Sequence, residues 1–224
     1  MDRRTLLGGL LAAGAITLPS VAWADTKSLK LGQAFAYLTN YYSMSPGKRD
    51  RFRLAYYAVR DRKFAPDLKA VVVSADGKRS PLVLERDARV AQLPSLAQLQ
   101  SSTLEIDVSP AAKVGLALVL EANMPASTHL DAAALAASIA QAEAGVASIA
   151  GVLSFAAPKI VSALFPEAAS GQALLDGGRA APLPTTTNWL WGQMPYYEPS
   201  SLAGARTLAF ARAPSRILLS DQPK

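Results

Sequence analysis

The chain of 224 residues has no cysteine and a single histidine, His129. Without a thiol it can form no disulfide, no cysteine-ligated zinc or iron–sulfur site and no thiol nucleophile. Any site that needs an imidazole must use His129. These absences weigh against an enzyme, and we predict neither a cofactor nor a metal site.

Sequence motifs of the common catalytic classes are also lacking. No H-E-x-x-H, D-x-D-x-D-G, Walker or G-x-S-x-G string occurs. Ser45 and Lys48 match the S-x-x-K spacing of penicillin-binding proteins, but the S-D-N and K-T-G elements are missing and Pro46-Gly47 is typical of a turn. The strand carboxylates are expected to face outward for solubility; they are Glu85, Glu105, Asp107 and Glu121.

Charged residues are scarce, at 18%, whereas 50% of the chain is apolar. This composition excludes a disordered chain and indicates a globular protein with a sizeable core. The length fits one ordinary domain or two small ones. The formal net charge of +6 favours anionic partners.

Residues 1–24 have the pattern of a cleavable export signal. Arg3-Arg4 precedes an uncharged stretch from Leu6 to Leu18, and Ala22-Trp23-Ala24 is a small-x-small cleavage site. The run Arg3-Arg4-Thr5-Leu6-Leu7 resembles a twin-arginine translocation signal, although Asp2 stands where that class usually has Ser or Thr. Sec export is the alternative. The uncharged stretch is shorter than the ~20 residues of a membrane span.

The leader predicts a bacterial protein of the periplasm or one that is secreted. The mature chain would be residues 25–224, a single α+β domain with no transmembrane anchor after cleavage. Export makes nucleic acid an unsuitable partner. The polyanions of the cell envelope remain available.

The first half of the mature chain contains one predicted helix and several strands. Apolar spacing predicts a helix over 31–42. Alternation predicts strands over 52–59, 68–74 and 82–85, with Asp76-Gly77 as a hairpin turn. For 52–59 a helix is the alternative, because Phe52, Ala55, Tyr56 and Val59 would also line one helix face. The apolar runs over 104–108 and 114–120 predict a second hairpin, whose latter strand is buried on both faces.

The second half begins with a helical pattern. Thr128 and Asp131 resemble a capping box at the start of a helix. Apolar residues then recur every three or four positions from Leu135 to Leu153, which predicts one narrow apolar face along this helix. Residues 167–205 are expected to be rich in loops, and strands are expected over 207–212 and 217–220. Strands followed by helices and again by strands indicate an α+β fold. We predict an antiparallel β-sandwich-like core with an N-terminal helix and a helical insertion around 127–165.

Two surface features are candidates for ligand binding. Trp189, Trp191, Tyr196 and Tyr197 lie within nine residues of a Pro-containing stretch, and aromatic loop residues with polar tips are common in ligand contacts. The alternative is that they fold back over the core. The second feature is a basic block over residues 48–63, in which Lys and Arg are interleaved with Phe52, Tyr56 and Tyr57. Its candidate ligand-binding residues are Arg51, Arg53 and Tyr57. The alternative is a solvated strand edge.

The function that these observations favour is non-enzymatic binding of an envelope ligand, namely a lipid, a glycan or a protein partner. The first alternative is a hydrolase that acts on cell-envelope material, through carboxylates that converge only in the fold. The second is an assembly factor that recognises another chain by strand addition at an open edge.

Overall fold

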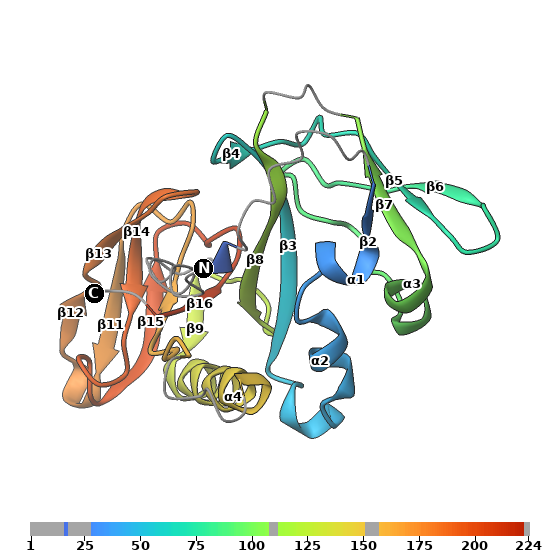
Figure 1. The fold of residues 1–224 in the computed structure, drawn as a ribbon. Helices are drawn as coiled ribbons and strands as arrows, with labels where there is room; N and C mark the ends of the chain where they lie inside the picture. Colours follow the sequence, from blue (N-terminus) through green and yellow to red (C-terminus); the bar gives the residue numbers. More distant parts are fainter. Residues whose placement is uncertain (1–15, 18–27, 108–111, 151–156, 222–224) are drawn as a thin grey trace, which may run out of the picture.

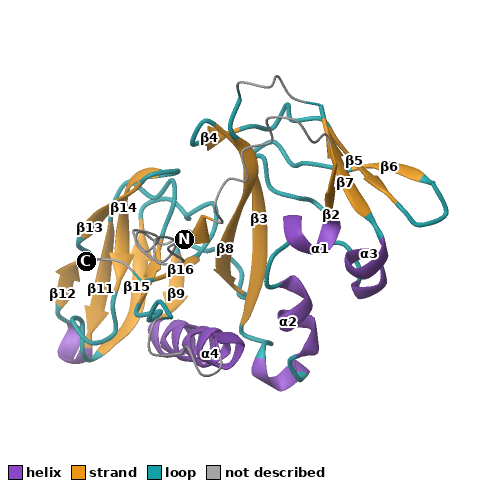
Figure 2. Ribbon diagram, viewed as in Figure 1, coloured by secondary structure: helices purple, strands orange, loops and turns teal. Residues whose placement is uncertain are grey.

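A computed structural model describes residues 16–17, 28–107, 112–150, 157–221. Its strands form three antiparallel sheets, with helices packed against them (Figure 1; Figure 2). The predicted α+β class with a sandwich-like antiparallel core is confirmed.

The largest sheet contains the residues that matter most for function. Its strand order is β13-β14-β10-β16-β8-β3-β4, and the short β1 also pairs with β8. The bounds are β1 Ile16–Thr17, β3 Phe52–Arg60, β4 Lys63–Phe64, β8 Val114–Ala122, β10 Ser162–Leu164, β13 Thr185–Asn188, β14 Gly192–Tyr197 and β16 Leu218–Ser220. This sheet curls into a half-barrel.

The long central strands β3 and β8 explain why the sheet has two apolar faces. They pair along their whole length, from Phe52 opposite Ala122 to Arg60 opposite Val114. Because side chains alternate between faces, Leu54 and Tyr56 enter the main core while Ala55 and Tyr57 enter a second apolar cluster. The prediction of a β8 strand buried on both faces is confirmed.

Two four-stranded sheets flank the half-barrel. One has the order β12-β11-β15-β9, and the other has the order β2-β7-β5-β6. Their bounds are β2 Ser28–Lys30, β5 Ala70–Val73, β6 Arg79–Pro81, β7 Thr103–Ile106, β9 His129–Asp131, β11 Gly171–Leu175, β12 Ala180–Pro182 and β15 Ala205–Phe210.

The hairpin around Asp76-Gly77 is present, but its second strand is β6 and not residues 82–85. Gly77 adopts a φ of +82°, which suits glycine in a tight turn. The second predicted hairpin is wrong: β7 pairs with β2 and β5, whereas β8 pairs with β3. Two apolar runs next to each other in sequence do not determine which partner each of them takes.

The N-terminal helix is broken into two. Helix α1 spans Leu31–Ala34 and α2 spans Leu38–Ser43, with Tyr37 between them at a φ of 65°. Leu31, Phe35 and Leu38 of the predicted apolar face are all buried. The buried face of the helix was therefore predicted correctly, whereas the prediction of one unbroken helix is wrong. Helix α3 spans Leu96–Ser101, and Ser95 and Gln98 form its capping box.

Helix α4, Ala132–Ala150, lies below β9 and β15 and beside the lower end of β3 in Figure 1. Its N-terminal cap is Asp131, whose Oδ1 accepts from the Ala134 N–H at 2.7 Å. Leu135, Ile139 and Ala142 of the predicted seam are buried, and Leu153 lies outside the described residues. By length and composition alone the window Ala132–Ile149 could cross a membrane, a test that core helices also pass.

Three other segments differ from the prediction. His129–Asp131 is strand β9 and Ser162–Leu164 is strand β10, so the helical insertion is shorter than 127–165. Residues 167–205 contain β11 to β14 and a 3-10 turn at Asp176–Gly178. Their small and polar residues pair through the backbone, which composition alone does not reveal.

Candidate functional site

The two ends of the half-barrel meet through aromatic side chains. Trp191, in the turn between β13 and β14, contacts Tyr57 of β3 and Phe64 of β4 edge-on, at ring-centroid distances of 5.1 and 5.2 Å. Strands β13 and β4 are the outermost strands of the sheet. These contacts therefore hold the curled sheet together across its concave side.

Tyr57 also connects this aromatic contact to a buried carboxylate. Its hydroxyl donates to Glu121 Oε1 at 2.7 Å, and Glu121 is only 1% exposed. Glu121 Oε2 accepts from Arg53 Nε at 2.9 Å and from Arg89 Nη2 at 3.1 Å. A buried carboxylate requires such partners because desolvation of an unpaired charge is costly.

A second layer of charges surrounds these residues. Arg216 Nη2 donates to Glu85 Oε2 at 2.7 Å and to Asp87 Oδ2 at 2.6 Å, and its Nε lies 4.0 Å from Glu121 Oε1. Arg89 also pairs with Glu85. We call these seven residues the Glu121 cluster: Arg53, Tyr57, Glu85, Asp87, Arg89, Glu121 and Arg216. Its three arginines balance its three carboxylates.

The segment from Glu85 to Arg89 is fixed to the sheet by its backbone. The Ala58 N–H donates to the Ala88 carbonyl, and the Val90 N–H donates to the Tyr56 carbonyl, each at 2.8 Å. Ala88 takes a φ of 66° and is fully buried. This turn brings the carboxylates of Glu85 and Asp87 to Arg216, which is far away in the sequence.

The environment shifts the pKa of two groups in the cluster. Burial, assisted by Glu121, raises the pKa of the Tyr57 hydroxyl above its usual value, so the hydroxyl remains a donor. Burial disfavours the charged form of Arg216, but its hydrogen bond to Asp87 and nearby negative groups raise the pKa further than burial lowers it. Arg216 is therefore a permanent cation.

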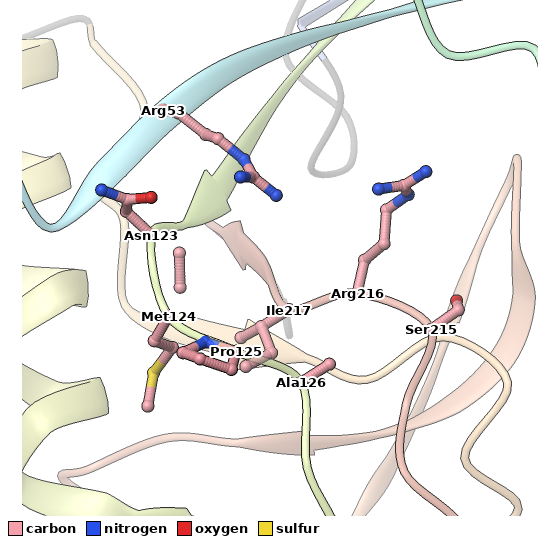
Figure 3. Close-up of a pocket in the computed structure, with 9 residues that line it drawn as sticks. Arg53, Asn123, Met124, Pro125, Ala126, Ser215, Arg216 and Ile217 are labelled. Carbon is pink, nitrogen blue, oxygen red and sulfur yellow. The ribbon is translucent and has the colours of Figure 1, made fainter. Parts of the chain in front are cut away.

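A pocket of about 350 Å³ opens beside the cluster (Figure 3). Figure 3 shows the side chains of Arg53 and Arg216 above Met124, Pro125 and Ile217, which form the floor of the pocket. Among the described residues that line this pocket there are two arginines and no carboxylate; the full lining is Arg53, Ala122, Asn123, Met124, Pro125, Ala126, Ser215, Arg216 and Ile217.

The hydrogen bonds leave donors available at this wall. Arg53 uses Nε for Glu121, and within the described part of the chain its two terminal nitrogens have no partner. Arg216 uses Nε and Nη2, which leaves Nη1. A guanidinium has five N–H donors in a fixed plane and matches the geometry of a carboxylate or phosphate group.

The predicted ligand-binding residues fall into three groups. Trp191, Tyr57 and Arg53 are brought together through Glu121, but Tyr57 itself is fully buried. Tyr196 and Trp189 are half-buried around the second apolar cluster, with Arg62 over the Trp189 ring at 5.6 Å.

The remaining two candidates lie elsewhere. Tyr197 is 3% exposed and packs in the main core. Arg51 is exposed, does not line the pocket, and donates its backbone N–H to Gln141. The basic block presents no stacking surface through Phe52, Tyr56 or Tyr57, because all three are buried.

The expectation that Glu121 faces outward is wrong, because the concave face of the curled sheet is itself covered. Glu121, Arg89 and Arg216 are the residues that sequence reasoning missed. One signal was present: Glu121 is the only charged residue in the otherwise apolar strand Val114–Ala122. Arg89 and Arg216 gave no such signal, since only the fold brings them to Glu121.

Other candidate chemistry does not converge on this pocket. His129 is exposed, and its Nδ1 lies 3.2 Å from the Thr128 hydroxyl. Ser45 precedes the exposed 3-10 turn Pro46–Lys48, as its Pro-Gly centre suggested. Within the described ranges, no group of three or more His, Asp or Glu residues is placed to hold a metal ion.

Comparison with models of known protein families, with curated proteins and with solved structures finds no match to this chain. A functional proposal must therefore be argued from the pocket and the Glu121 cluster.

Proposed function

We propose that the chain is an exported, non-enzymatic binding protein whose ligand carries a carboxylate or phosphate group, held between Arg53 and Arg216. The observation that supports this proposal is a pocket wall that, among the described residues, has two arginines with terminal nitrogens free of partners and no carboxylate. Export rests on the leader-like pattern of residues 1–24.

The cluster supports binding by holding the two arginines in place. Arg53 is fixed through Nε by Glu121, and Arg216 is fixed through Nε and Nη2 by Asp87 and Glu85. A guanidinium that is already oriented loses less conformational entropy when a ligand arrives. The net positive charge of the chain also favours the approach of an anion.

The apolar part of the ligand has a suitable neighbouring surface. Arg53 lies on the same face of β3 as Ala55 and Tyr57, and Met124, Pro125 and Ile217 form an apolar floor. An anionic envelope lipid, or another amphiphile with an anionic end, fits this combination better than a free sugar does. A hydrolase is less well supported, because every carboxylate of the Glu121 cluster is paired with arginine.

Isothermal titration at low salt tests this proposal with two probes, inorganic phosphate and dihexanoyl phosphatidic acid. The Arg53→Gln variant should weaken the binding of either probe by at least about tenfold, which corresponds to the loss of one charge-assisted contact. Arg51→Gln is the matched control, because Arg51 is exposed nearby but does not line the pocket. Circular dichroism verifies the fold of both variants.

The outcomes separate the parts of the proposal. Binding of both probes with a preference for the lipid supports an amphiphile, and binding of phosphate alone supports only an anion site. Absence of binding by either probe, or an equal loss in the two variants, would refute the proposed pocket. Native mass spectrometry of the purified protein would then identify any ligand that stays bound.

A further inference from the structure

The turn that joins β13 to β14 presents three large apolar side chains, Trp189, Leu190 and Trp191, which we call the aromatic tip. Each of them is half-buried, so part of each side chain remains open to solvent. No lysine, arginine, aspartate or glutamate occurs from Leu183 to Tyr197. This hairpin can therefore approach an apolar phase without desolvating a charge.

The aromatic tip is held in one conformation by its own turn. The carboxamide oxygen of the buried Asn188 accepts from the Leu190 N–H at 2.9 Å and from the Trp191 N–H at 3.4 Å. Gly192 follows with a φ of +76°, which closes the turn. Because the tip is ordered in advance, little conformational entropy would be lost when a partner binds to it.

A basic turn lies against the aromatic tip. Asp61 and Arg62 join β3 to β4, and the Arg62 guanidinium lies over the Trp189 ring, 5.6 Å from its centroid. The Asp61 N–H donates to the Lys113 carbonyl at 2.9 Å, which brings Lys113 to the same end of the sheet. Within the part of the chain that the structure describes, Arg62, Lys63 and Lys113 have no salt-bridge partner. Free cations thus lie beside an uncharged apolar tip.

The backbone of the basic turn has a conformation that glycine adopts more easily than arginine does. Asp61 and Arg62 have φ angles of 50° and 64°, as a two-residue type I′ turn requires at both positions. A side chain disfavours this left-handed conformation, and such strain is concentrated at functional sites. The turn itself therefore favours glycine at position 62, whereas arginine supplies a cation beside Trp189.

We propose that the aromatic tip and the basic turn together form a docking surface for an anionic lipid bilayer. Trp189 and Leu190 enter the headgroup region, where tryptophan is enriched in membrane proteins, while Arg62 and Lys63 contact the lipid phosphates. Charge complementarity identifies this occupant, because a neutral glycan would stack on the tryptophans without using the cations. The net charge of +6 favours the same partner.

This docking surface is distinct from the pocket between Arg53 and Arg216. Arg53 lies near the start of β3, whereas the basic turn follows its last residue, Arg60, and β4 lies at the upper end of β3 in Figure 1. A strand rises about 3.3 Å per residue, so Arg60 lies roughly 23 Å from Arg53. The inference therefore does not depend on anion binding in the pocket.

The absence of cysteine allows one spin label to report on this surface alone. Leu190→Cys in the full chain carries a nitroxide, and vesicles of phosphatidylcholine with phosphatidylglycerol are added. Electron paramagnetic resonance measures collisions of the label with oxygen, which dissolves in lipid, and with a nickel complex, which stays in water. The vesicles should increase the collisions with oxygen and decrease those with the nickel complex. Lys78→Cys, on the exposed turn between β5 and β6, is the control and should show neither change.

A second label keeps the test valid if the loss of Leu190 itself weakens docking. Gln193→Cys places the nitroxide on the exposed start of β14 and leaves all three residues of the aromatic tip in place. It should respond to the same vesicles in the same direction. Vesicles of phosphatidylcholine alone should act far more weakly on either label.

Removal of the cations tests the electrostatic part of the proposal. Each lysine or arginine near an anionic bilayer strengthens binding about fivefold, so Arg62→Gly with Lys63→Gln should raise the lipid concentration at half-change about 25-fold. The unfolding midpoint in urea should not fall, because glycine suits the turn. Lys48→Gln with Lys78→Gln removes the same charge elsewhere and should raise that concentration less than about twofold.

Each part of the proposal can be refuted separately. It fails if the labels at positions 190 and 193 both stay in water when the anionic vesicles are added. It also fails if the two charge-removing pairs have equal effects, or if phosphatidylcholine alone acts as strongly as the anionic mixture. Binding of inorganic phosphate to the pocket should be the same in Arg62→Gly with Lys63→Gln as in the parent chain, which separates this test from that of the proposed function.

Discussion

Replacement of Glu121 by glutamine should destabilise the protein more than any conservative change of a surface carboxylate. Glu121→Gln keeps the shape of the side chain and an oxygen that can accept from Tyr57. It removes the charge opposite Arg89, whose side chain is 15% exposed, and opposite Arg53, which is 45% exposed. The amide nitrogen also faces arginine donors, to which it can offer no lone pair.

The magnitude follows from these exposures. The buried contact with Arg89 contributes about 1.5–3 kcal/mol as a hydrogen bond between charged groups. The contact with Arg53 is partly screened by solvent and adds about 0.5 kcal/mol. We expect a loss of about 3 kcal/mol, which for a chain of this size lowers Tm by about 6–12 °C.

Urea unfolding followed by circular dichroism measures this loss of stability. Glu105→Gln is the matched control, because Glu105 pairs with Arg79 on the surface and should give an unfolding midpoint within error of the parent chain. A double-mutant cycle with Arg89→Gln should show a coupling of about 1–3 kcal/mol. A change below about 0.5 kcal/mol for Glu121→Gln, or no coupling, would refute the role assigned to the buried pair.

Three further predictions concern the core, the aromatic contacts and pH. Gly145→Ala should lower the free energy of unfolding by about 1–3 kcal/mol in urea, because the added Cβ would lie 2.7 Å from Phe52 Cζ. This loss should outweigh the higher helix propensity of alanine. Gly115→Ala is the control and should be neutral, because an added Cβ there meets no atom within 4 Å. Trp191→Ala should cost about 2 kcal/mol in the same assay, because Trp191 joins the rings of Tyr57 and Phe64. Trp189→Ala should cost less, because Trp189 packs against the same apolar cluster and under Arg62 without joining two strands through ring contacts. The opposite ranking would contradict the closure of the half-barrel. The raised pKa of Tyr57 means that its contribution to stability is fully present well below pH 10 and is lost as pH rises toward the folded-state pKa. The parent chain should therefore lose about 1 kcal/mol more stability than Tyr57→Phe between pH 10 and 11, measured by urea unfolding at each pH.

Local patterns predicted much of the fold. The alternation over 52–59 and the apolar run over 114–120 correspond to β3 and β8, and the Asp76-Gly77 turn joins β5 and β6. Such elements depend on neighbours in the sequence. The pairing of β7 with β2 and β5 depends on long-range contacts, and so does the order of the largest sheet. The spacing of apolar residues within one segment does not determine which strands pair or in what order.

The candidate site shows the same division. The aromatic stretch and the basic block each stood out in the sequence, but their connection through Tyr57 and Glu121 depends on the curl of the sheet. Glu121 was assigned to solvent because an antiparallel sheet commonly has one wet face. Here Trp191 and its neighbours cover that face, so the side chain of Glu121 is buried beneath them and does not reach solvent.

The Glu121 cluster contributes more to the orientation of Arg53 and Arg216 than to the stability of the fold. A buried group of ion pairs is rarely more stabilising than apolar side chains of the same volume, because desolvation offsets the attraction between charges. Stability alone therefore gives little reason to bury Glu121 beside Arg89 and Arg216, whose side chains are 15% and 19% exposed. What an apolar replacement could not provide is the orientation of Arg53 and Arg216, whose remaining nitrogens face one pocket. On this argument the carboxylates act as supports for the arginines, and Asp87→Asn should weaken anion binding in the pocket although Asp87 does not line it.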